Sequence, residues 1–249
     1  MRMENQLEKI AKSYDRHFIE HGDENALSYD NLPDYITNNP DYPYWDKERK
    51  SANSHENDRT DLINYLSPEK NMNFINLGCS LNLRFKGYDK WQSTYYGVDI
   101  SRETIQFLYE YVAENNLPIG SLYCGSVHET PFKYNYFDIG DCVGVLEYYE
   151  RDFVLKAIKE FHRILKPNAK LVLDIPNIES PSGRAMILIE ECMGRPDKFD
   201  MLPNEFEDMI KDYFIIEDSD KIRAEKNGCT HDKMVCFYYL KCRKNQDRV

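Results

Sequence analysis

From Asn73 onward, short apolar runs alternate with amphipathic helical patterns, and this alternation is the feature that most limits the possible folds. Such a pattern predicts a mostly parallel α/β sheet with helices on both faces. The seven expected strands are residues 74–77, 94–98, 121–124, 137–143, 170–175, 213–217 and 234–240. The main expected helices are residues 102–114, 152–165 and 205–211, and Asp152 is the expected N-cap of the second.

The first 69 residues follow a different pattern and predict a helical and loop cap on the sheet. Residues 3–20 and 59–66 have helical periodicity, whereas residues 28–54 are rich in Asn, Asp, Pro and Tyr and predict an irregular aromatic loop. We therefore expect a cap over residues 1–69 and an α/β domain over residues 70–249. Within that domain, residues 179–202 form an insertion whose apolar stretch 185–189 indicates a substrate lid helix. The aromatic loop either covers a ligand or packs the cap against the core.

Charge and cysteine content exclude several classes of function. With 43 acidic and 32 basic residues the net charge is −11, which argues against a nucleic-acid substrate. No apolar run reaches the length of about 20 residues that a membrane span requires, so no membrane partner is expected. The 7 cysteines lack metal-ligand spacing, so we expect no metal site and a cytoplasmic protein with reduced thiols. The oligomeric state is left open.

A glycine turn follows the first strand of the sheet. Gly78, Cys79 and Ser80 come directly after the apolar run 74–77. In a βα unit such a turn brings backbone N–H groups to the carboxyl edge of the sheet, and glycine permits a ligand to approach closely. One glycine after a strand is also an ordinary turn, so this segment alone does not define a site.

A carboxylate ends the second strand, about 20 residues after the glycine turn. Asp99 at that position can accept hydrogen bonds from both ribose hydroxyls of a nucleoside. A solvated Asp that caps the following helix is the structural alternative. Together, Gly78 and Asp99 at this spacing favour a nucleoside ligand.

Five segments in order resemble the class I S-adenosylmethionine-dependent methyltransferases, particularly the small-molecule group typified by ubiquinone-biosynthesis methyltransferases. The similarity is carried by the segments 74–82, 96–101, 125–132, 137–148 and 163–171, and the Tyr14-Asp15 pair resembles an N-terminal helix motif of that family. The resemblance implies a Rossmann-like, seven-stranded, mostly parallel sheet with an N-terminal cap. It also implies S-adenosyl-L-methionine as cofactor and methyl transfer to an O, N or C atom of a small-molecule acceptor.

The resemblance further implies which residues line the cofactor pocket. Ile100 and Val127 are expected to sandwich the adenine, Ser126 to face its amino group, and Tyr14 to act as a lid. The full set of implied cofactor-binding residues is Tyr14, Asn76, Gly78, Cys79, Ser80, Asp99, Ile100, Ser126, Val127 and Val143. Cys79 is interpreted as a small packing residue rather than a nucleophile.

Three residues depart from the family pattern around the glycine turn. Asn76 replaces the usual acidic residue, and Ser80 and Asn82 replace glycines. An amide still accepts a hydrogen bond, but without charge assistance. These changes are also those expected of a non-catalytic descendant.

Residues after the fourth strand are expected nearest the transferred methyl group. Tyr148, Glu147 and His128 are the candidate catalytic residues, with a surface or adenine-side role as the alternative for His128. Tyr148 stands where the family commonly has His, which removes an obvious general base. Asp141 lies within a strand, where a buried carboxylate needs a partner that the sequence does not reveal.

Two other functions remain open at this level. A catalytically silent nucleoside-binding or regulatory module would explain Asn76, Ser80 and Asn82. An NAD-dependent oxidoreductase would also use Asp99, but the chain lacks a GxGxxG pattern.

Overall fold

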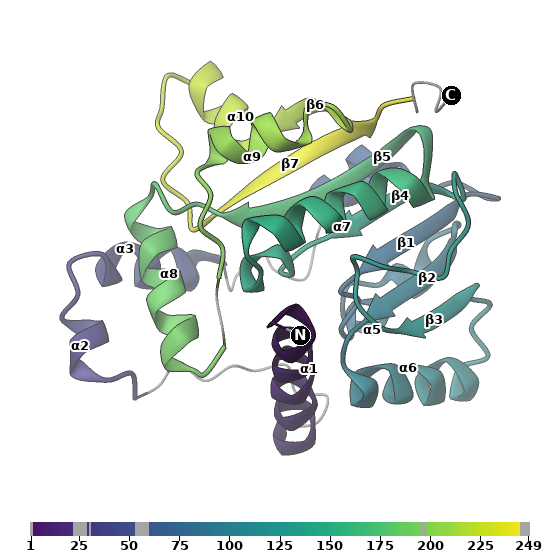
Figure 1. Cartoon of the computed structure of the whole chain (residues 1–249), viewed down its shortest axis with the longest axis horizontal. Coiled ribbons are helices and arrows are strands. Elements are labelled where there is room, and N and C mark those ends of the chain that lie inside the picture. Colours follow the sequence, from purple (N-terminus) through teal and green to yellow (C-terminus); the bar gives the residue numbers. More distant parts are fainter. Residues whose placement is uncertain (1, 22–28, 30, 53–59, 196–197, 245–249) are drawn as a thin grey trace.

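The computed structural model contains one seven-stranded sheet flanked by helices (Figure 1). It describes residues 2–21, 29, 31–52, 60–195 and 198–244. The strand order is β3-β2-β1-β4-β5-β7-β6. The strands are β1 (Asn73–Leu77), β2 (Thr94–Asp99), β3 (Ser121–Cys124), β4 (Phe137–Cys142), β5 (Leu165–Pro176), β6 (Phe214–Ser219) and β7 (Val235–Cys242). The expected mostly parallel, seven-stranded sheet is therefore confirmed.

The chain reverses its direction of travel across the sheet between β1 and β4. Strands β1 to β5 pair in parallel, whereas β7 is antiparallel to both β5 and β6. In open α/β sheets, ligands bind outside the carboxyl ends of the strands at such a switch point. The topology therefore directs attention to the residues that follow β1, β2 and β4.

Helices cover both faces of the sheet with separate apolar clusters. On one face lie α7 (Arg151–Ile164), α9 (Pro203–Ile210) and part of α1 (Arg2–His21). On the other lie α4 (Thr60–Leu66) and α6 (Arg102–Glu114). A further helix, α10 (Asp220–Lys226), joins β6 to β7. Figure 1 shows α1 below the sheet, between α6 and the helices α2, α3 and α8.

The connection from β1 to β2 is short and irregular, as the poor helical pattern of residues 83–91 indicated. It contains only α5 (Asn82–Phe85) and the 3₁₀ turn η1 (Tyr88–Lys90). An aromatic cluster covers the sheet where a longer helix would otherwise lie. The ring centroids of Tyr88 and Trp91 are 5.1 and 4.8 Å from that of Phe74, so these rings supply the buried apolar area.

The prediction of an irregular loop over residues 28–54 was wrong for much of that segment. Helices α2 (Asp34–Thr37) and α3 (Tyr42–Ala52) form there and pack against α8 (Pro181–Cys192), the expected lid helix. Trp45 and Ile36 are buried in this contact with Ala185 and Ile189. The aromatic residues thus gain helical structure from tertiary packing that local composition does not encode.

Several element boundaries also differ from expectation, among them the starts of α7 and β5. The N-cap of α7 is Glu150 rather than Asp152, which lies in the first turn of the helix and suits its dipole. Strand β5 begins at Leu165 instead of residue 170, because Leu165 pairs with Phe137 ahead of an irregularity in the register. The division at residues 69 and 70 stays a prediction.

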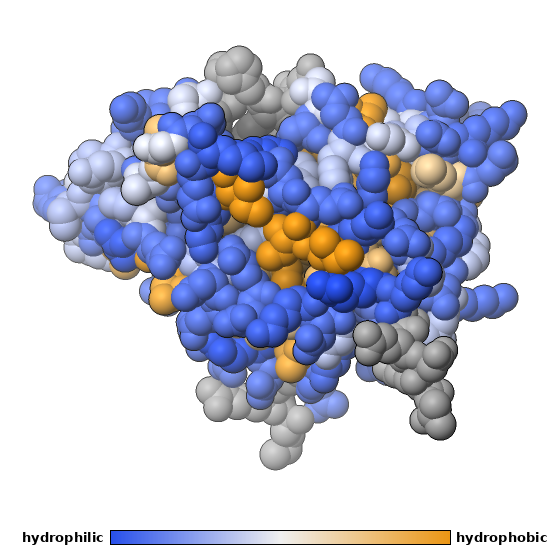
Figure 2. Space-filling model, turned by 90° about the horizontal axis from the view of Figure 1, so that it is seen from above, coloured by the Kyte–Doolittle hydropathy of each residue, from blue (hydrophilic) through white to orange (hydrophobic). Residues whose placement is uncertain are grey.

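The surface is predominantly polar. Figure 2 shows one face of the molecule as largely hydrophilic, with an apolar patch near its centre and smaller apolar areas around it. None of the described helices combines the length and the hydrophobicity that crossing a bilayer requires.

Candidate cofactor and acceptor site

The glycine turn after β1 is tied to the end of β2. The N–H groups of Gly78 and Cys79 both donate to the carbonyl of Val98 at 2.8 Å. Gly78 has φ +73°, and a Cβ atom there would lie 2.1 Å from Cγ2 of Val145. Glycine is therefore required both by the backbone conformation and by the close packing of Val145.

Asp99 lies at the carboxyl end of β2 and is only 8% exposed. One carboxylate oxygen accepts from the N–H of Ser80 at 2.8 Å, and the other from the N–H of Ser101 at 2.9 Å. Burial raises the pKa of Asp99, with the nearby Asp15 adding to the effect. Each oxygen has a second lone pair, so the carboxylate can still accept from two hydroxyl groups.

Helix α1 is fixed to the end of β2 through Asp15, which the sequence did not single out as a site residue. Oδ1 of Asp15 accepts from the hydroxyl of Ser101 at 2.7 Å and from the N–H of Glu103 at 3.3 Å. Ser101 itself is the N-cap of α6. The contact brings the N-terminal helix to the same edge as Asp99.

Asn76 belongs to a buried hydrogen-bond network on the α4 and α6 face of the sheet. Its amide donates to Oδ1 of Asp141 at 2.6 Å, and its carbonyl accepts from the hydroxyl of Tyr95 at 3.1 Å. Tyr88 donates to Oδ2 of Asp141 at 2.7 Å. The partners of the buried Asp141, which the sequence left open, are therefore Asn76 and Tyr88.

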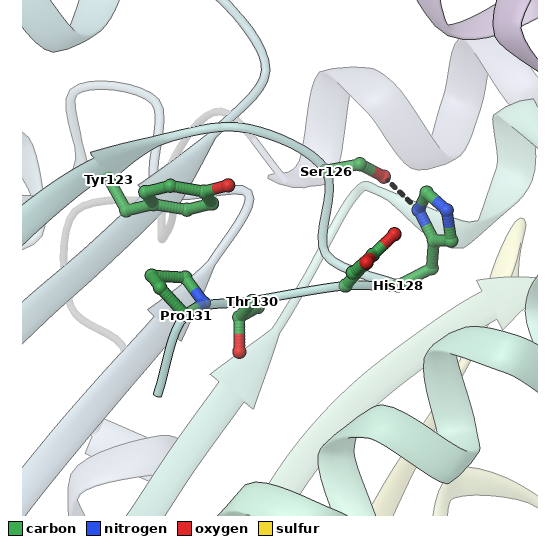
Figure 3. Close-up of a pocket in the computed structure, with 6 residues that line it drawn as sticks. Tyr123, Ser126, His128, Thr130 and Pro131 are labelled. Carbon is green, nitrogen blue, oxygen red and sulfur yellow. Dashed lines mark hydrogen bonds between the residues drawn. The ribbon is translucent and has the colours of Figure 1, made fainter. Parts of the chain in front are cut away.

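A pocket of about 330 Å³ lies just beyond β3. It is lined by Tyr123, Ser126, His128, Glu129, Thr130 and Pro131. Figure 3 shows the imidazole of His128 turned toward the hydroxyl of Ser126, to which Nδ1 is hydrogen-bonded at 2.6 Å. Burial lowers the pKa of His128, so the ring is neutral at physiological pH.

The predicted apolar residues of the pocket divide between the two faces of the sheet. Val127 is 4% exposed and Ile100 packs beside it in the cluster under α7. Val143 and Cys79 pack in the cluster on the opposite face. Burial raises the pKa of the Cys79 thiol well above its usual value, which fits a packing residue rather than a nucleophile.

The turn after β4 is anchored by a carboxylate from β5. Gly144 has φ +71°, and its N–H donates to Oδ1 of the buried Asp174 at 2.8 Å. The chain then forms the 3₁₀ turn η2 (Leu146–Tyr148). The carbonyl of Glu147 accepts from the N–H groups of Lys198 and Phe199, so the segment after α8 crosses this turn.

Tyr14 and Tyr148 meet at this edge of the sheet. Their ring centroids are 5.8 Å apart at an interplanar angle of 82°, and the amide of Gln6 donates to the carbonyl of Tyr148 at 2.8 Å. The guanidinium of Arg195 lies 6.0 Å from the Tyr14 ring and pairs with Glu190 at 3.0 Å. Burial raises the pKa of Tyr148, which keeps its hydroxyl protonated.

The structure brings several of the predicted residues to one edge of the sheet. Asp99 ends β2, Ser80, Ser126 and Tyr148 come from segments that follow strands, and Tyr14 joins them from α1. The side chain of Asn76 is instead engaged with Asp141 and Tyr95. Arg195 and Glu190 were missed, because no local pattern marks a charge in the last turn of α8 and another just after it as neighbours of Tyr14.

No group of three or more metal-ligating side chains occurs in the described part of the chain. The polar groups at this edge instead suit a nucleoside. Asp99 can still accept hydrogen bonds from a ligand, and the pocket beside Ser126 lies one strand further along the sheet. An adenosine held by Asp99 would therefore find a pocket on the side of β3.

Comparison with known proteins agrees with this geometry. Residues 75–173 match the methyltransferase domain family. An uncharacterized protein of Methanocaldococcus jannaschii is 40% identical over 57 residues, a match that spans 23% of this chain and 24% of that protein. The chain therefore matches about a quarter of that relative's length.

Solved structures share the fold at low sequence identity. The geranyl diphosphate C-methyltransferase of Streptomyces coelicolor A3(2), solved with S-adenosyl-L-homocysteine, superposes with a TM-score of 0.62 at 14% identity, covering 95% of this chain and 97% of that one. The [4+2]-cyclase SpnF superposes with a TM-score of 0.56 at 13% identity, covering 74% and 79%. Residues 75–173 therefore resemble a methyltransferase domain, and the chain shares the fold of these solved structures.

Proposed function

We propose that this chain transfers a methyl group from S-adenosyl-L-methionine to an O, N or C atom of a small molecule. The observation that carries the proposal is Asp99, a buried carboxylate at the end of β2 in a methyltransferase domain. Both of its oxygens are held by backbone N–H groups and can accept two more hydrogen bonds. This is the arrangement that two vicinal ribose hydroxyls require.

The cofactor would extend from Asp99 toward Ser126 at one end and toward the turn after β4 at the other. Ile100 and Val127 offer apolar contact for the adenine, and Ser126 a hydroxyl for its edge. When bound, the sulfonium supplies an electrophilic methyl group, so the protein has mainly to align the acceptor and exclude water. Tyr148 is buried and Tyr14 is half-buried, so both rings can help to exclude water from this edge.

Tyr148, Glu147 and His128 remain the proposed catalytic residues. The raised pKa of Tyr148 suits a hydrogen-bond donor to the acceptor rather than a general base. The neutral His128 can accept a proton, but its contact with Ser126 places it toward the adenine side. Glu147 therefore is the more suitable base for an acceptor that must lose a proton.

The partner that we propose is a small molecule rather than a nucleic acid, since the net charge of −11 disfavours a phosphate backbone. The seven cysteines are free thiols, which supports a reducing, cytoplasmic location.

A silent nucleoside-binding module is the second candidate, favoured by one observation. Val145 packs closely over Gly78, and Asn76 is committed to Asp141, so the glycine turn presents less to a ligand than the family pattern implies. An oxidoreductase that uses NAD is disfavoured by the methyltransferase domain match.

Calorimetric titration with S-adenosylmethionine, S-adenosylhomocysteine and NAD separates these functions. We expect both sulfur nucleosides to bind and NAD not to bind. If neither S-adenosylmethionine nor S-adenosylhomocysteine binds, the proposal is overturned. Binding without methyl transfer to any member of a broad acceptor panel would favour the silent module.

A further inference from the structure

Arg195 is an unusually placed cation just after the lid helix α8. Its side chain is only 16% exposed, and Nη1 donates to Oε2 of Glu190 at 3.0 Å. Among the residues that the structure describes, Glu190 is its one hydrogen-bonding partner. A guanidinium carries five N–H donors, so most of them remain available.

The charge of Arg195 is stable in this position. Burial by itself would lower the pKa of the guanidinium, but Glu190 and the hydroxyls of Tyr148 and Tyr14 raise it, and the net direction is upward. Arg195 therefore stays protonated at every physiological pH. The fixed partner Glu190 also holds the guanidinium in one orientation.

A buried ion pair of this kind needs an explanation other than stability. Removing two charges from water costs several kcal/mol per ion, and replacing such a pair with apolar residues is often neutral or stabilising. An exposed pair such as Arg151 and Glu205, at 2.7 Å, has no such cost. The lid segment therefore retains a costly cation at a particular place.

That place is the edge at which methyl transfer is proposed. The segment after α8 crosses η2 through the two hydrogen bonds to the carbonyl of Glu147. Arg195 faces the Tyr14 ring, and Tyr14 contacts Tyr148. Burial raises the pKa of Tyr149, next along the chain, and Tyr14 and Asp99 add to the effect.

We propose that Arg195, oriented by Glu190, binds a carboxylate at this edge of the sheet, beside Tyr14 and Tyr148. Arginine matches the planar carboxylate through two parallel N–H donors. The inference rests on the proposed function, and the carboxylate has two chemical sources. It belongs either to the amino-acid part of the cofactor or to the methyl acceptor.

The test compares S-adenosylhomocysteine with 5′-methylthioadenosine, which keeps the nucleoside but lacks the amino-acid part. Both are titrated into the wild-type chain and into R195Q. If the carboxylate is that of the cofactor, R195Q lowers the affinity for S-adenosylhomocysteine about tenfold or more, the loss of a charge-assisted hydrogen bond. The affinity for 5′-methylthioadenosine is then unchanged.

A second titration tests the acceptor as the source. Benzoate and its uncharged counterpart benzamide are titrated into protein saturated with S-adenosylhomocysteine. If Arg195 binds the acceptor, benzoate binds to the wild-type chain and not to R195Q, while benzamide binds to neither. R195K keeps the charge but loses the planar pair of donors, so its binding affinity should lie between those of the wild-type chain and R195Q. It replaces R195Q in the test if R195Q is poorly folded.

The exposed pair supplies the matched control, since R151Q likewise removes an arginine from a glutamate, here Glu205, and both of those side chains are exposed. R151Q should bind every probe as the wild-type chain does. Equal losses for both nucleosides in R195Q, or no loss for S-adenosylhomocysteine together with no Arg195-dependent benzoate binding, would overturn the inference alone. Failure of both nucleosides to bind to the wild-type chain would overturn the proposed function and this inference with it.

Discussion

Two buried polar clusters lie near the same strand ends but differ in how completely they are paired. The sealed cluster consists of Asn76, Tyr88, Tyr95 and Asp141, with three hydrogen bonds of 2.6 to 3.1 Å among its members. The edge cluster consists of Tyr14, Tyr148, Glu190 and Arg195. In the edge cluster the guanidinium of Arg195 keeps donors that no described residue uses, so it has capacity for a ligand that the sealed cluster lacks.

This difference distinguishes polar residues that stabilise the fold from polar residues that can bind a ligand. A buried network in which every polar group is hydrogen-bonded contributes to stability and to a unique fold. A cation at a strand edge that uses only some of its donors contributes little to stability. The chain has thus placed a carboxylate, Asp141, opposite Asn76 on the neighbouring strand, where the pair is in register. The acidic residue that the family pattern expects at position 76 is replaced by this cross-strand pair.

The largest expected effect comes from Asn76→Asp, which would bring two carboxylates together inside the sealed cluster. Because two like charges in contact cannot both stay ionised, we expect a loss of about 3 kcal/mol in the free energy of unfolding. Urea denaturation measures it. The double variant N76D/D141N, which restores one carboxylate and one amide, should recover about half of the loss.

The exposed Asn227→Asp is the control and should change stability by less than about 0.5 kcal/mol. If N76D has the same urea denaturation midpoint as the wild-type chain, Asp141 is not held as a charged carboxylate in the sealed cluster. The proposed difference between the two clusters would then be wrong.

Removing one hydroxyl from each cluster sharpens the comparison. Tyr88→Phe leaves Oδ2 of Asp141 without that donor, so we expect a loss of about 1–3 kcal/mol. Tyr148→Phe, the same chemical change in the edge cluster, should cost less than about 1 kcal/mol, because the hydroxyl that loses its partner is that of Tyr14 and is uncharged. Thermal and urea unfolding of the two variants should therefore differ, and equal losses would contradict the division.

Asp99 is buried like the sealed cluster, but like the edge cluster it keeps hydrogen-bonding capacity for a ligand, here as an acceptor. We expect Asp99→Ala to lower the affinity for S-adenosylhomocysteine at least tenfold, which corresponds to about 1.4 kcal/mol and the loss of one charge-assisted hydrogen bond. Calorimetry measures the affinity. Asp208→Ala, on a side chain that is 76% exposed, is the control. An unchanged dissociation constant for D99A would mean that the ribose lies elsewhere.

The smallest effect is a pH dependence. Burial raises the pKa of Asp99 above its ordinary value of 3.8, so the folded state favours the protonated carboxyl. Its contribution to stability is therefore full below the unfolded pKa and is lost as the pH rises through the folded pKa. Nucleoside affinity runs in the opposite direction, falling as the pH is lowered through the folded pKa. Titrations at several pH values should show this trend in the wild-type chain and not in D99N.

Much of the sheet was predictable because strand signals are local. The runs at 121–124 and 74–77 are apolar and bounded by turn residues, and they become β3 and β1 with at most one residue added. The helical structure of residues 34–52 was not predictable, because Trp45 and Ile36 are stabilised by α8, more than 100 residues away. The start of α7 was also predicted imprecisely, since its N-cap is Glu150 and not Asp152.

The sequence alone determined the α/β class, the methyltransferase domain and the position of Asp99, since periodicity and motif spacing are properties of neighbouring residues. Only the tertiary structure decided that Asn76 faces Asp141 and that Arg195 faces Tyr14. These pairs join residues distant in the chain, and their contacts follow from strand register and from the packing of α1 against the sheet. Local propensity contains no information about either contact, because burial and pairing arise only when separate segments assemble.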